Sequence, residues 1–228
     1  MIDINEQLYS VKFIFIGDSG VGKTNIIYRY TKGEFLKDYN PTIGVDFSTI
    51  NLKVNDKIFH LELWDTVGME NFKSIRQNYY KNAACAIIVY DITDIKTFES
   101  LDKWIEECQN YSNNDDLLMV LVGNKCDLSS ERNVSEKEGK SLKNKYGLRL
   151  FYESSALNGY NIDKIFSDCC SEIYKIISNL DEEKELPGIT NDTGKYKKEE
   201  IDKSLKFSLI QGNENNNNRQ NNSCSCCC

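Results

Sequence analysis

The sequence predicts an α/β fold, with a mostly parallel six-stranded sheet, one antiparallel edge hairpin and helices on both faces. Continuous apolar runs at 84–90 and 117–122 are typical of parallel strands that are covered on both sides. Over 162–180, apolar residues recur at helical spacing. Alternation of such strands and helices is what a doubly wound sheet requires.

Each element has its own local signal. Residues 46–54 and 58–65 alternate apolar and polar side chains around Asn55-Asp56, which favours a hairpin with one exposed face. Ser135 with Glu138 forms a capping box, which marks the start of a helix. The expected elements, in chain order, are strand 8–16, helix 25–31, strands 46–54 and 58–65, strands 84–90 and 117–122, a helix after Ser135, strand 150–152 and helix 162–180.

The composition divides the chain into one domain, residues 1–180, and a tail, residues 181–228. Seven of the ten residues 213–222 are Asn, and a segment this poor in apolar surface does not offset its ordering entropy, so we expect a disordered tether. The longest apolar run, 83–90, is too short to span a membrane, and the first residues lack the pattern of a secretory signal. We therefore expect a protein on the cytosolic side, whose scattered thiols are reduced.

The charge of the chain bears on its partners. The formal net charge is −7 and the pI is near 5.0, which argues against broad binding to nucleic acid. Any phosphate that this chain binds must therefore be bound by a local site.

Residues 17–24, Gly-Asp-Ser-Gly-Val-Gly-Lys-Thr, match the phosphate-binding pattern G-x-x-x-x-G-K-[ST] between an expected strand and an expected helix. Backbone N–H groups of such a loop wrap phosphates, Lys23 reaches the β and γ phosphates, and the Thr24 hydroxyl ligates Mg²⁺. The alternative, a glycine-rich turn that happens to carry a lysine, is disfavoured by this context. The predicted binding residues here are Ser19, Gly20, Val21, Gly22, Lys23, Thr24 and Asn25.

Two further segments are candidates for the metal and the γ-phosphate. Asp65 ends the second hairpin strand, where its carboxylate can hold Mg²⁺, and the N–H of Gly68 can reach a γ-phosphate. Taken alone, this D-x-x-G pattern is weak, because it is frequent in loops. Thr42 follows Pro41 and can bring a second hydroxyl to the metal; an ordinary turn threonine is the alternative.

The run Asn124-Lys125-Cys126-Asp127 follows a buried strand and reports the identity of the base. The Asp127 carboxylate only accepts hydrogen bonds, so it matches the N1–H and N2–H₂ donors of guanine and would be left unpaired by adenine. Backbone N–H groups of Ser155, Ala156 and Leu157 can reach the guanine O6. Phe35 either stacks on the base or anchors its loop in the core.

Together these motifs resemble the small GTPases of the Ras superfamily over about residues 8–180, which implies a P-loop GTPase fold. Residues 43–47, the Trp64-Asp65-Thr66 junction, the Tyr79-Tyr80 pair and the terminal cysteines resemble the Rab family. The resemblance implies a switch in vesicle-mediated transport, in which GTP orders the loops around Thr42 and Gly68, and hydrolysis releases them. It also implies partners: effectors, an exchange factor, an activating protein, a prenyl-carrying escort and a GDP dissociation inhibitor. The residues that would face effectors are Ile43, Phe47, Trp64 and Tyr79.

Two residues depart from the family pattern, which usually reads Ala-Gly-Gln-Glu after Asp-Thr. Met69 stands at the glutamine position and cannot orient an attacking water, and Val67 brings a branched side chain near the metal. We expect slow intrinsic hydrolysis, with Thr42, Gly68 and Met69 at the catalytic positions. Activating proteins of this family insert an arginine and a glutamine, which could restore turnover. The alternative is a GTP-bound binding module that does not hydrolyse.

The last six residues, Ser-Cys-Ser-Cys-Cys-Cys, resemble ends that carry two geranylgeranyl groups, on Cys227 and Cys228 or on Cys226 and Cys228. A metal or disulfide cluster is the alternative. Residues 181–228 hold seven Lys or Arg and nine Asp or Glu, a net charge of −2, so the tail offers no electrostatic attraction to a membrane. We expect lipid attachment to the cytoplasmic face of a vesicle or organelle membrane, in exchange with the cytosol.

Overall fold

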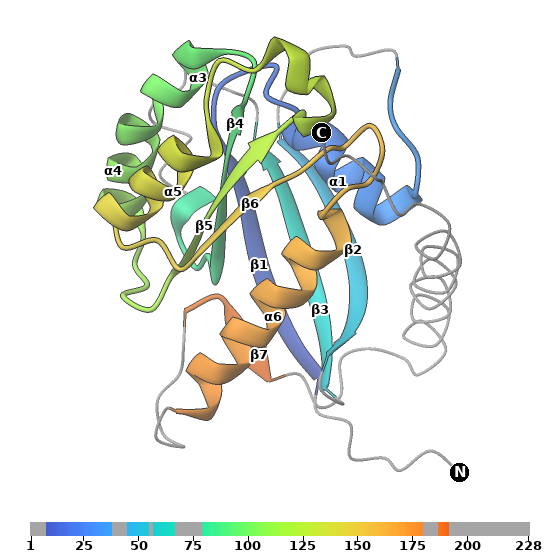
Figure 1. Ribbon diagram of the computed structural model, residues 1–228. Coiled ribbons are helices and arrows are strands. Elements are labelled where there is room, and N and C mark those ends of the chain that lie inside the picture. The colour runs from blue at the N-terminus through green and yellow to red at the C-terminus, as the bar shows by residue number, and fades with distance from the viewer. Residues whose placement is uncertain (1–7, 38–44, 55–56, 67–78, 180–186, 192–228) are drawn as a thin grey trace.

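A computed structural model describes residues 8–37, 45–54, 57–66, 79–179 and 187–191 (Figure 1). Its strands form one sheet in the order β2-β3-β1-β4-β5-β6, with a further strand, β7, paired to β1. The strands are β1 (Leu8–Ile16), β2 (Val45–Val54), β3 (Lys57–Thr66), β4 (Cys85–Asp91), β5 (Leu118–Asn124), β6 (Leu150–Glu153) and β7 (Ile189–Asn191).

The pairing confirms a mostly parallel sheet with an antiparallel edge hairpin. The pairs β1/β3, β1/β4, β4/β5 and β5/β6 are parallel. The edge pair β2/β3 is antiparallel and places Phe47 opposite Trp64. The hairpin turn at 55–56 lies outside the described residues.

The described part of the chain contains α-helices and a short 3₁₀-helix. The α-helices are α1 (Lys23–Lys32), α3 (Ile95–Glu99), α4 (Leu101–Tyr111), α5 (Glu136–Lys145) and α6 (Ile162–Ser178), and a 3₁₀-helix, η1, covers Cys126–Glu131. The predicted capping box at the start of α5 is confirmed: the Ser135 hydroxyl accepts from the Glu138 N–H, and the Glu138 carboxylate accepts from the Ser135 N–H. None of the described helices combines the length and the apolar character needed to cross a membrane.

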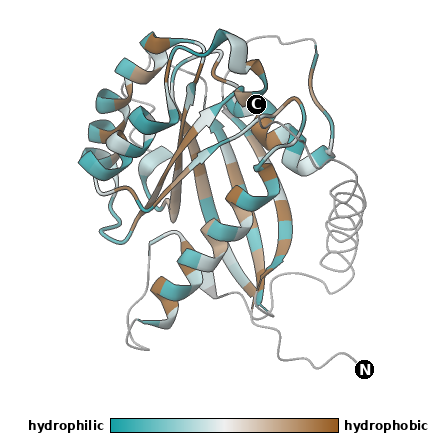
Figure 2. Cartoon of the chain, in the orientation of Figure 1, coloured by the Kyte–Doolittle hydropathy of each residue, from teal (hydrophilic) through white to brown (hydrophobic). Residues whose placement is uncertain are grey.

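The helices cover both faces of the sheet and divide the core into two. Phe13 and Phe15 of β1 point to one face, where α1 and α6 pack, and Tyr30 of α1 stacks on Phe166 of α6 with ring centroids 3.7 Å apart. Ile14 of the same strand points to the other face, toward α4 and α5. Figure 2 shows this arrangement as strands rich in hydrophobic residues beneath helices of mixed character. The central strands are therefore packed on both faces, which fixes the positions from which the loops after β1 and β5 start.

Residues 187–191 correct the expectation that the tail begins at 181. β7 pairs antiparallel with β1 from Tyr9 to Val11, and the Lys12 N–H donates to the Gly188 carbonyl at 3.2 Å. The physical reason is an open edge: β3 pairs with β1 from Leu8, but β4 pairs with its other edge only from Phe13 onward. The backbone N–H and C=O groups before Phe13 that face away from β3 are therefore available to β7. The rest of the expected tail, 181–186 and 192–228, lies outside the described residues.

Candidate functional site

Four of the predicted binding motifs follow or end the strands β1, β3, β5 and β6 at their carboxyl ends. Because parallel strands end at the same edge of a sheet, the loops after β1, β5 and β6 meet there with the end of β3. This edge is the usual position of ligand sites in open α/β sheets.

The loop between β1 and α1 requires glycine at two positions because of close approach. A Cβ on Gly17, whose φ is +135°, would lie 2.1 Å from the carbonyl oxygen of Val89 on β4. A Cβ on Gly22, whose φ is +97°, would lie 2.3 Å from Nδ2 of Asn124. The loop is therefore pressed against β4 and β5, and only this backbone shape fits.

Lys23 is the first residue of α1 and its side chain is buried. Its Nζ donates to the carbonyl oxygens of Gly17 and Asp18, at 2.8 Å each. Burial lowers the pKa of Lys23 to about 8, and the nearby Asp65 and Asp18 carboxylates oppose that shift. The ammonium group is thus held inside the curve of the loop, where an added phosphate would raise its pKa again and favour the charged form.

Thr24 and Asp65, two of the residues predicted to ligate Mg²⁺, lie in contact. The Thr24 Oγ1 donates to Asp65 Oδ2 at 2.6 Å, which joins the start of α1 to the end of β3. Asp65 is 2% exposed, and its Oδ1 has no hydrogen-bond partner among the described residues. Burial raises the pKa of Asp65, while Thr24 and Lys23 lower it. An orphaned buried carboxylate oxygen beside a hydroxyl is a donor set that suits Mg²⁺.

The remaining residues predicted near the γ-phosphate, namely Thr42, Gly68 and Met69, lie outside the described residues, as do Val67, Ile43 and the terminal cysteines.

Asn124 was predicted to bind nucleotide, and the structure gives it a bridging role within the protein. It is 1% exposed; its Nδ2 donates to the Val21 carbonyl at 2.9 Å, and its Oδ1 accepts from Ser154 Oγ and from the Ala156 N–H, both at 3.3 Å. The side chain therefore ties the phosphate loop to the loop that follows β6.

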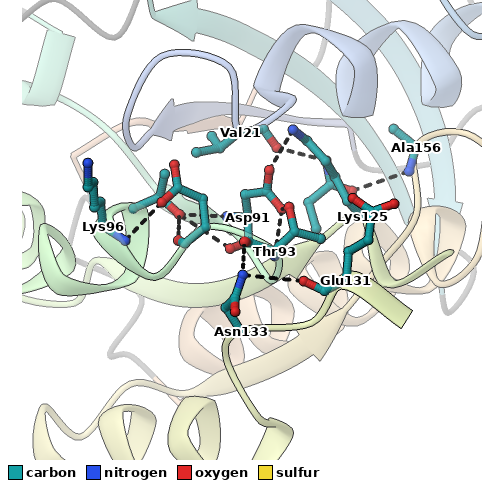
Figure 3. A network of polar contacts seen from close by, with 11 residues as sticks. Val21, Asp91, Thr93, Lys96, Lys125, Glu131, Asn133 and Ala156 are labelled. Atoms are coloured by element: carbon teal, nitrogen blue, oxygen red, sulfur yellow. Dashed lines mark hydrogen bonds and ion pairs between the residues drawn. The ribbon is translucent and has the colours of Figure 1, made fainter. Parts of the chain in front are cut away.

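Lys125 has a left-handed backbone with φ +67°, and its Nζ forms an ion pair with Asp91 Oδ2 at 2.6 Å. Asp91 is buried at the end of β4, and its Oδ1 accepts from the N–H and the hydroxyl of Thr93, at 2.8 Å each. Figure 3 shows Lys125 and Asp91 in this network between Val21 and Asn133. Asp91 was not identified from the sequence, because nothing in its spacing separates it from an ordinary strand-end aspartate.

Asp127 lies on η1 and is held by the loop after β6. The buried Ser155 donates its hydroxyl to Asp127 Oδ1 and accepts from the Asn158 N–H at 3.2 Å. Ala156 is buried, whereas Leu157 is exposed. The predicted base-binding carboxylate is therefore oriented by the same loop whose N–H groups were predicted to meet the base.

Two predicted nucleotide residues make contacts within the protein. Asn25 Oδ1 accepts from the Leu36 N–H at 3.0 Å, which fixes the segment after α1. Phe35 is half-buried and packs against the core beneath α1 and α6, in accord with the core-anchor alternative. Stacking of Phe35 on a base stays a prediction.

Arg29 of α1 holds the base loop, and sequence reasoning missed it. Its Nε donates to the Ala156 carbonyl at 2.8 Å, and its two terminal nitrogens donate to the carbonyls of Leu157 and Gly33. Nothing in the local sequence of α1 indicates this role, because the partners of Arg29 in the base loop lie 127 and 128 positions away in the chain.

The aromatic residues predicted to face effectors lie together on β2, β3 and the segment before β4. The rings of Phe47 and Trp64 meet edge to face with centroids 5.3 Å apart, and Tyr79 lies 6.4 Å from Trp64. Phe47 is 49% exposed, and Lys12 Nζ lies 4.5 Å from the centre of the Trp64 ring. This aromatic cluster is thus formed within the protein and is partly open to solvent.

Comparisons with known proteins agree with this geometry. A family model described as "Ras family" matches residues 12–175. The chain is 44% identical over 174 residues to "Ras-related protein RABA2b" of Arabidopsis thaliana, which covers 76% of this chain and 80% of that protein. It is 40% identical over 183 residues to "Ras-related protein Rab-2B" of Dictyostelium discoideum, which covers 80% of this chain and 87% of that protein. Given the phosphate loop, the threonine–aspartate pair and the base loops on this sheet, the chain belongs to the Ras family of small GTPases and is Rab-like within it.

Proposed function

We propose that this chain binds GTP and GDP with Mg²⁺ and acts as a Rab-type switch in vesicle-mediated transport. The observation that carries the proposal is the joint placement of Lys23, the Thr24–Asp65 pair and the Asp127–Ser155 pair at one edge of the sheet. Family membership supports the same reaction class, hydrolysis of GTP to GDP and phosphate.

The phosphate half of the site works through charge and fixed donors. Two hydrogens of the Lys23 ammonium group are directed to backbone carbonyls, which leaves a third for the β and γ phosphates. Thr24 and Asp65, with Thr42 as a further candidate, would hold Mg²⁺, which neutralises phosphate charge when bound. Ser19, Gly20, Val21 and Gly22 supply backbone N–H groups around the phosphates.

The base half of the site selects guanine through Asp127. Ser155 donates to one of its oxygens and so fixes the carboxylate, which then accepts from guanine N1–H and N2–H₂. Asp127→Asn should weaken GTP binding by roughly a hundredfold or more and let xanthine nucleotides compete, because one acceptor becomes a donor. Competition against a fluorescent guanine nucleotide measures this, with the exposed Glu131→Gln on the same 3₁₀-helix as control. Unchanged GTP affinity in Asp127→Asn would contradict the assignment.

Hydrolysis is proposed to be slow without a partner, because Met69 cannot position water. Single-turnover hydrolysis should accelerate in Met69→Gln, alone or with Val67→Ala, and each tenfold gain corresponds to about 1.4 kcal/mol of barrier. If neither change nor their combination raises the rate, the idea that these two positions disable hydrolysis is wrong. Single-turnover hydrolysis with and without an activating protein separates the switch from the second candidate, a GTP-bound binding module. That candidate is favoured by the two sequence departures alone.

The proposed partners follow from the aromatic cluster and the tail. Phe47, Trp64 and Tyr79, with Ile43, form the surface proposed for effectors, and the exposed Phe47 offers the apolar anchor. An exchange factor, an activating protein, an escort and a GDP dissociation inhibitor complete the proposed cycle between cytosol and a vesicle membrane. Intact mass of membrane-purified protein would count lipids on Cys227 and Cys228, and protein that stays membrane-bound without the terminal cysteines would overturn lipid anchoring.

A further inference from the structure

The carboxylate of Asp18, inside the phosphate loop, is held by residues that belong to no nucleotide-binding motif. Ser100 Oγ donates to Asp18 Oδ2 at 2.6 Å, and Trp104 Nε1 donates to Asp18 Oδ1 at 2.7 Å. Each carboxylate oxygen therefore has its own donor from a part of the chain more than eighty residues away. Hydrogen bonds to an ionised group are the strong class of protein hydrogen bonds.

The two donors are placed by the junction of α3 and α4. Ser100 ends α3, where its N–H donates to the Lys96 carbonyl, and it also precedes the first residue of α4. Trp104 follows four positions later, so both side chains lie on the same face of the helix. Trp104 is 3% exposed, and its ring packs in the core between α4 and the sheet. The donors are thus fixed by packing before any ligand is considered.

Asp18 passes this restraint to the phosphate-binding lysine. Its carbonyl oxygen accepts from Lys23 Nζ at 2.8 Å, while its side chain is bonded to α4. A rotation of Asp18 would therefore move one of the two carbonyls that aim the ammonium group. The loop backbone beside it is already confined at Gly17, so the Asp18 side chain is a point at which α4 can affect the shape of the phosphate loop.

We propose that Ser100 and Trp104 are positioning residues for phosphate binding, which act through Asp18 and slow the release of the nucleotide. The inference rests on the proposed binding of guanine nucleotide and extends it to a control point on α4. It also makes the α3–α4 junction a place where a binding partner could change nucleotide retention without touching the nucleotide.

The test measures release of a fluorescent GDP from Mg²⁺-loaded protein in variants that remove one donor each. Trp104→Phe keeps an aromatic side chain at this position but removes the indole N–H, and Ser100→Ala removes the hydroxyl. Each should speed release by roughly ten- to a hundredfold, the range that corresponds to loss of a hydrogen bond to a charged group. Ser100→Thr keeps a hydroxyl and should release GDP at the wild-type rate.

A matched control separates positioning from general loss of stability. Ile105→Val trims the same core beside Trp104 without contact to Asp18, and should lower the unfolding midpoint while leaving release unchanged. If Trp104→Phe and Ser100→Ala change release no more than Ile105→Val, the bonds to Asp18 are merely structural and the inference is wrong.

A spectroscopic measurement reports the bond directly. The chain has two tryptophans, so its ¹⁵N spectrum has two indole N–H signals, which Trp64→Phe assigns. Asp18→Asn should shift the Trp104 signal and leave the Trp64 signal in place; an unmoved Trp104 signal overturns the inference. Wild-type protein that binds no guanine nucleotide would instead overturn the proposed function, and this inference with it.

Discussion

The strand β7 should be able to detach from β1 while the rest of the domain stays folded, and substitution of Gly188 tests this. Gly188 has φ +81°, and a Cβ there would lie 2.1 Å from the Asn82 carbonyl oxygen and 2.9 Å from the Ala84 nitrogen. All three are backbone features, so no side-chain movement can relieve the clash. Gly188→Ala should therefore prevent residues 187–191 from packing as they do here.

The loss of stability in Gly188→Ala cannot exceed the stability that docking of residues 187–191 contributes. Bonds such as the Lys12 N–H to Gly188 and the Asn114 amide to Pro187, both 3.2 Å, are present only when the segment is docked. Such bonds contribute about 1 kcal/mol each and Ile189 packs against the core, but ordering the segment costs roughly 1–2 kcal/mol per residue. These contributions largely cancel, so we expect docking to stabilise the fold by about 2 kcal/mol at most. Gly188→Ala should lower the free energy of unfolding by no more than this amount.

Gly17 provides the contrast, because its Cβ would meet a carbonyl oxygen at the same 2.1 Å distance. It lies between paired strands and the phosphate loop and has no way to detach, so Gly17→Ala should cost about 3 kcal/mol or more. Gly147→Ala isolates backbone strain alone, because Gly147 has φ +63° with nothing within 4 Å of a Cβ. We expect a loss of about 1 kcal/mol there.

Urea unfolding at a fixed nucleotide concentration ranks the three variants, and hydrogen exchange locates the effect. In Gly188→Ala the Lys12 amide should lose its protection, while the Phe15 amide, in the part of β1 flanked by β3 and β4, should keep it. The idea that β7 can detach would be refuted if Gly188→Ala lowered the free energy of unfolding as much as Gly17→Ala does, or if the Lys12 amide stayed protected.

Two other predictions concern single side chains of α1. Arg29→Lys keeps the charge but loses the forked donor to Ala156 and Leu157, so guanine-nucleotide affinity should fall about tenfold with unchanged far-UV circular dichroism; equal affinity would contradict it. The pKa of Lys23 is about 8 when folded, below its ordinary 10.5, so unfolding takes up a proton between these values. Relative to Lys23→Met, nucleotide-free wild-type protein should therefore gain stability as the pH increases from 8 to 10. The comparison is needed because burial raises the pKa of the Cys85, Cys108 and Cys170 thiols, which lowers the stability of both proteins in this window.

Most of the fold could be predicted because its signals are local. The bounds predicted for β1 from its apolar run match the structure. β2 begins one residue earlier than predicted, and β3 is one residue longer at each end. β7 could not be predicted, because its three residues carry little apolar pattern. The edge of β1 with which β7 pairs is open only because β4 first pairs with β1 at Phe13. The register between strands that are distant in the chain cannot be derived from residue spacing.

The candidate site was predictable where a motif encodes it and invisible where a distant side chain completes it. Lys23 and the Thr24–Asp65 pair lie where the motifs placed them. Asn124 lies at the predicted place but bonds to protein on both sides. The bond from Trp104 to Asp18 joins residues 86 positions apart, and no spacing rule for a helix or strand reaches that far.

These bonds divide the site into two halves with separate supports. The phosphate half is held through Asp18 by α4, and the base half is held through Ala156 by Arg29 of α1. Asn124 joins them, since its amide spans from Val21 in one half to Ala156 in the other. α1 begins at the phosphate loop and carries Arg29 two turns later, so a shift of this helix would disturb both halves at once. A shift of α4 would instead disturb the phosphate loop first, through Asp18, so the two helices act on different halves of the candidate site.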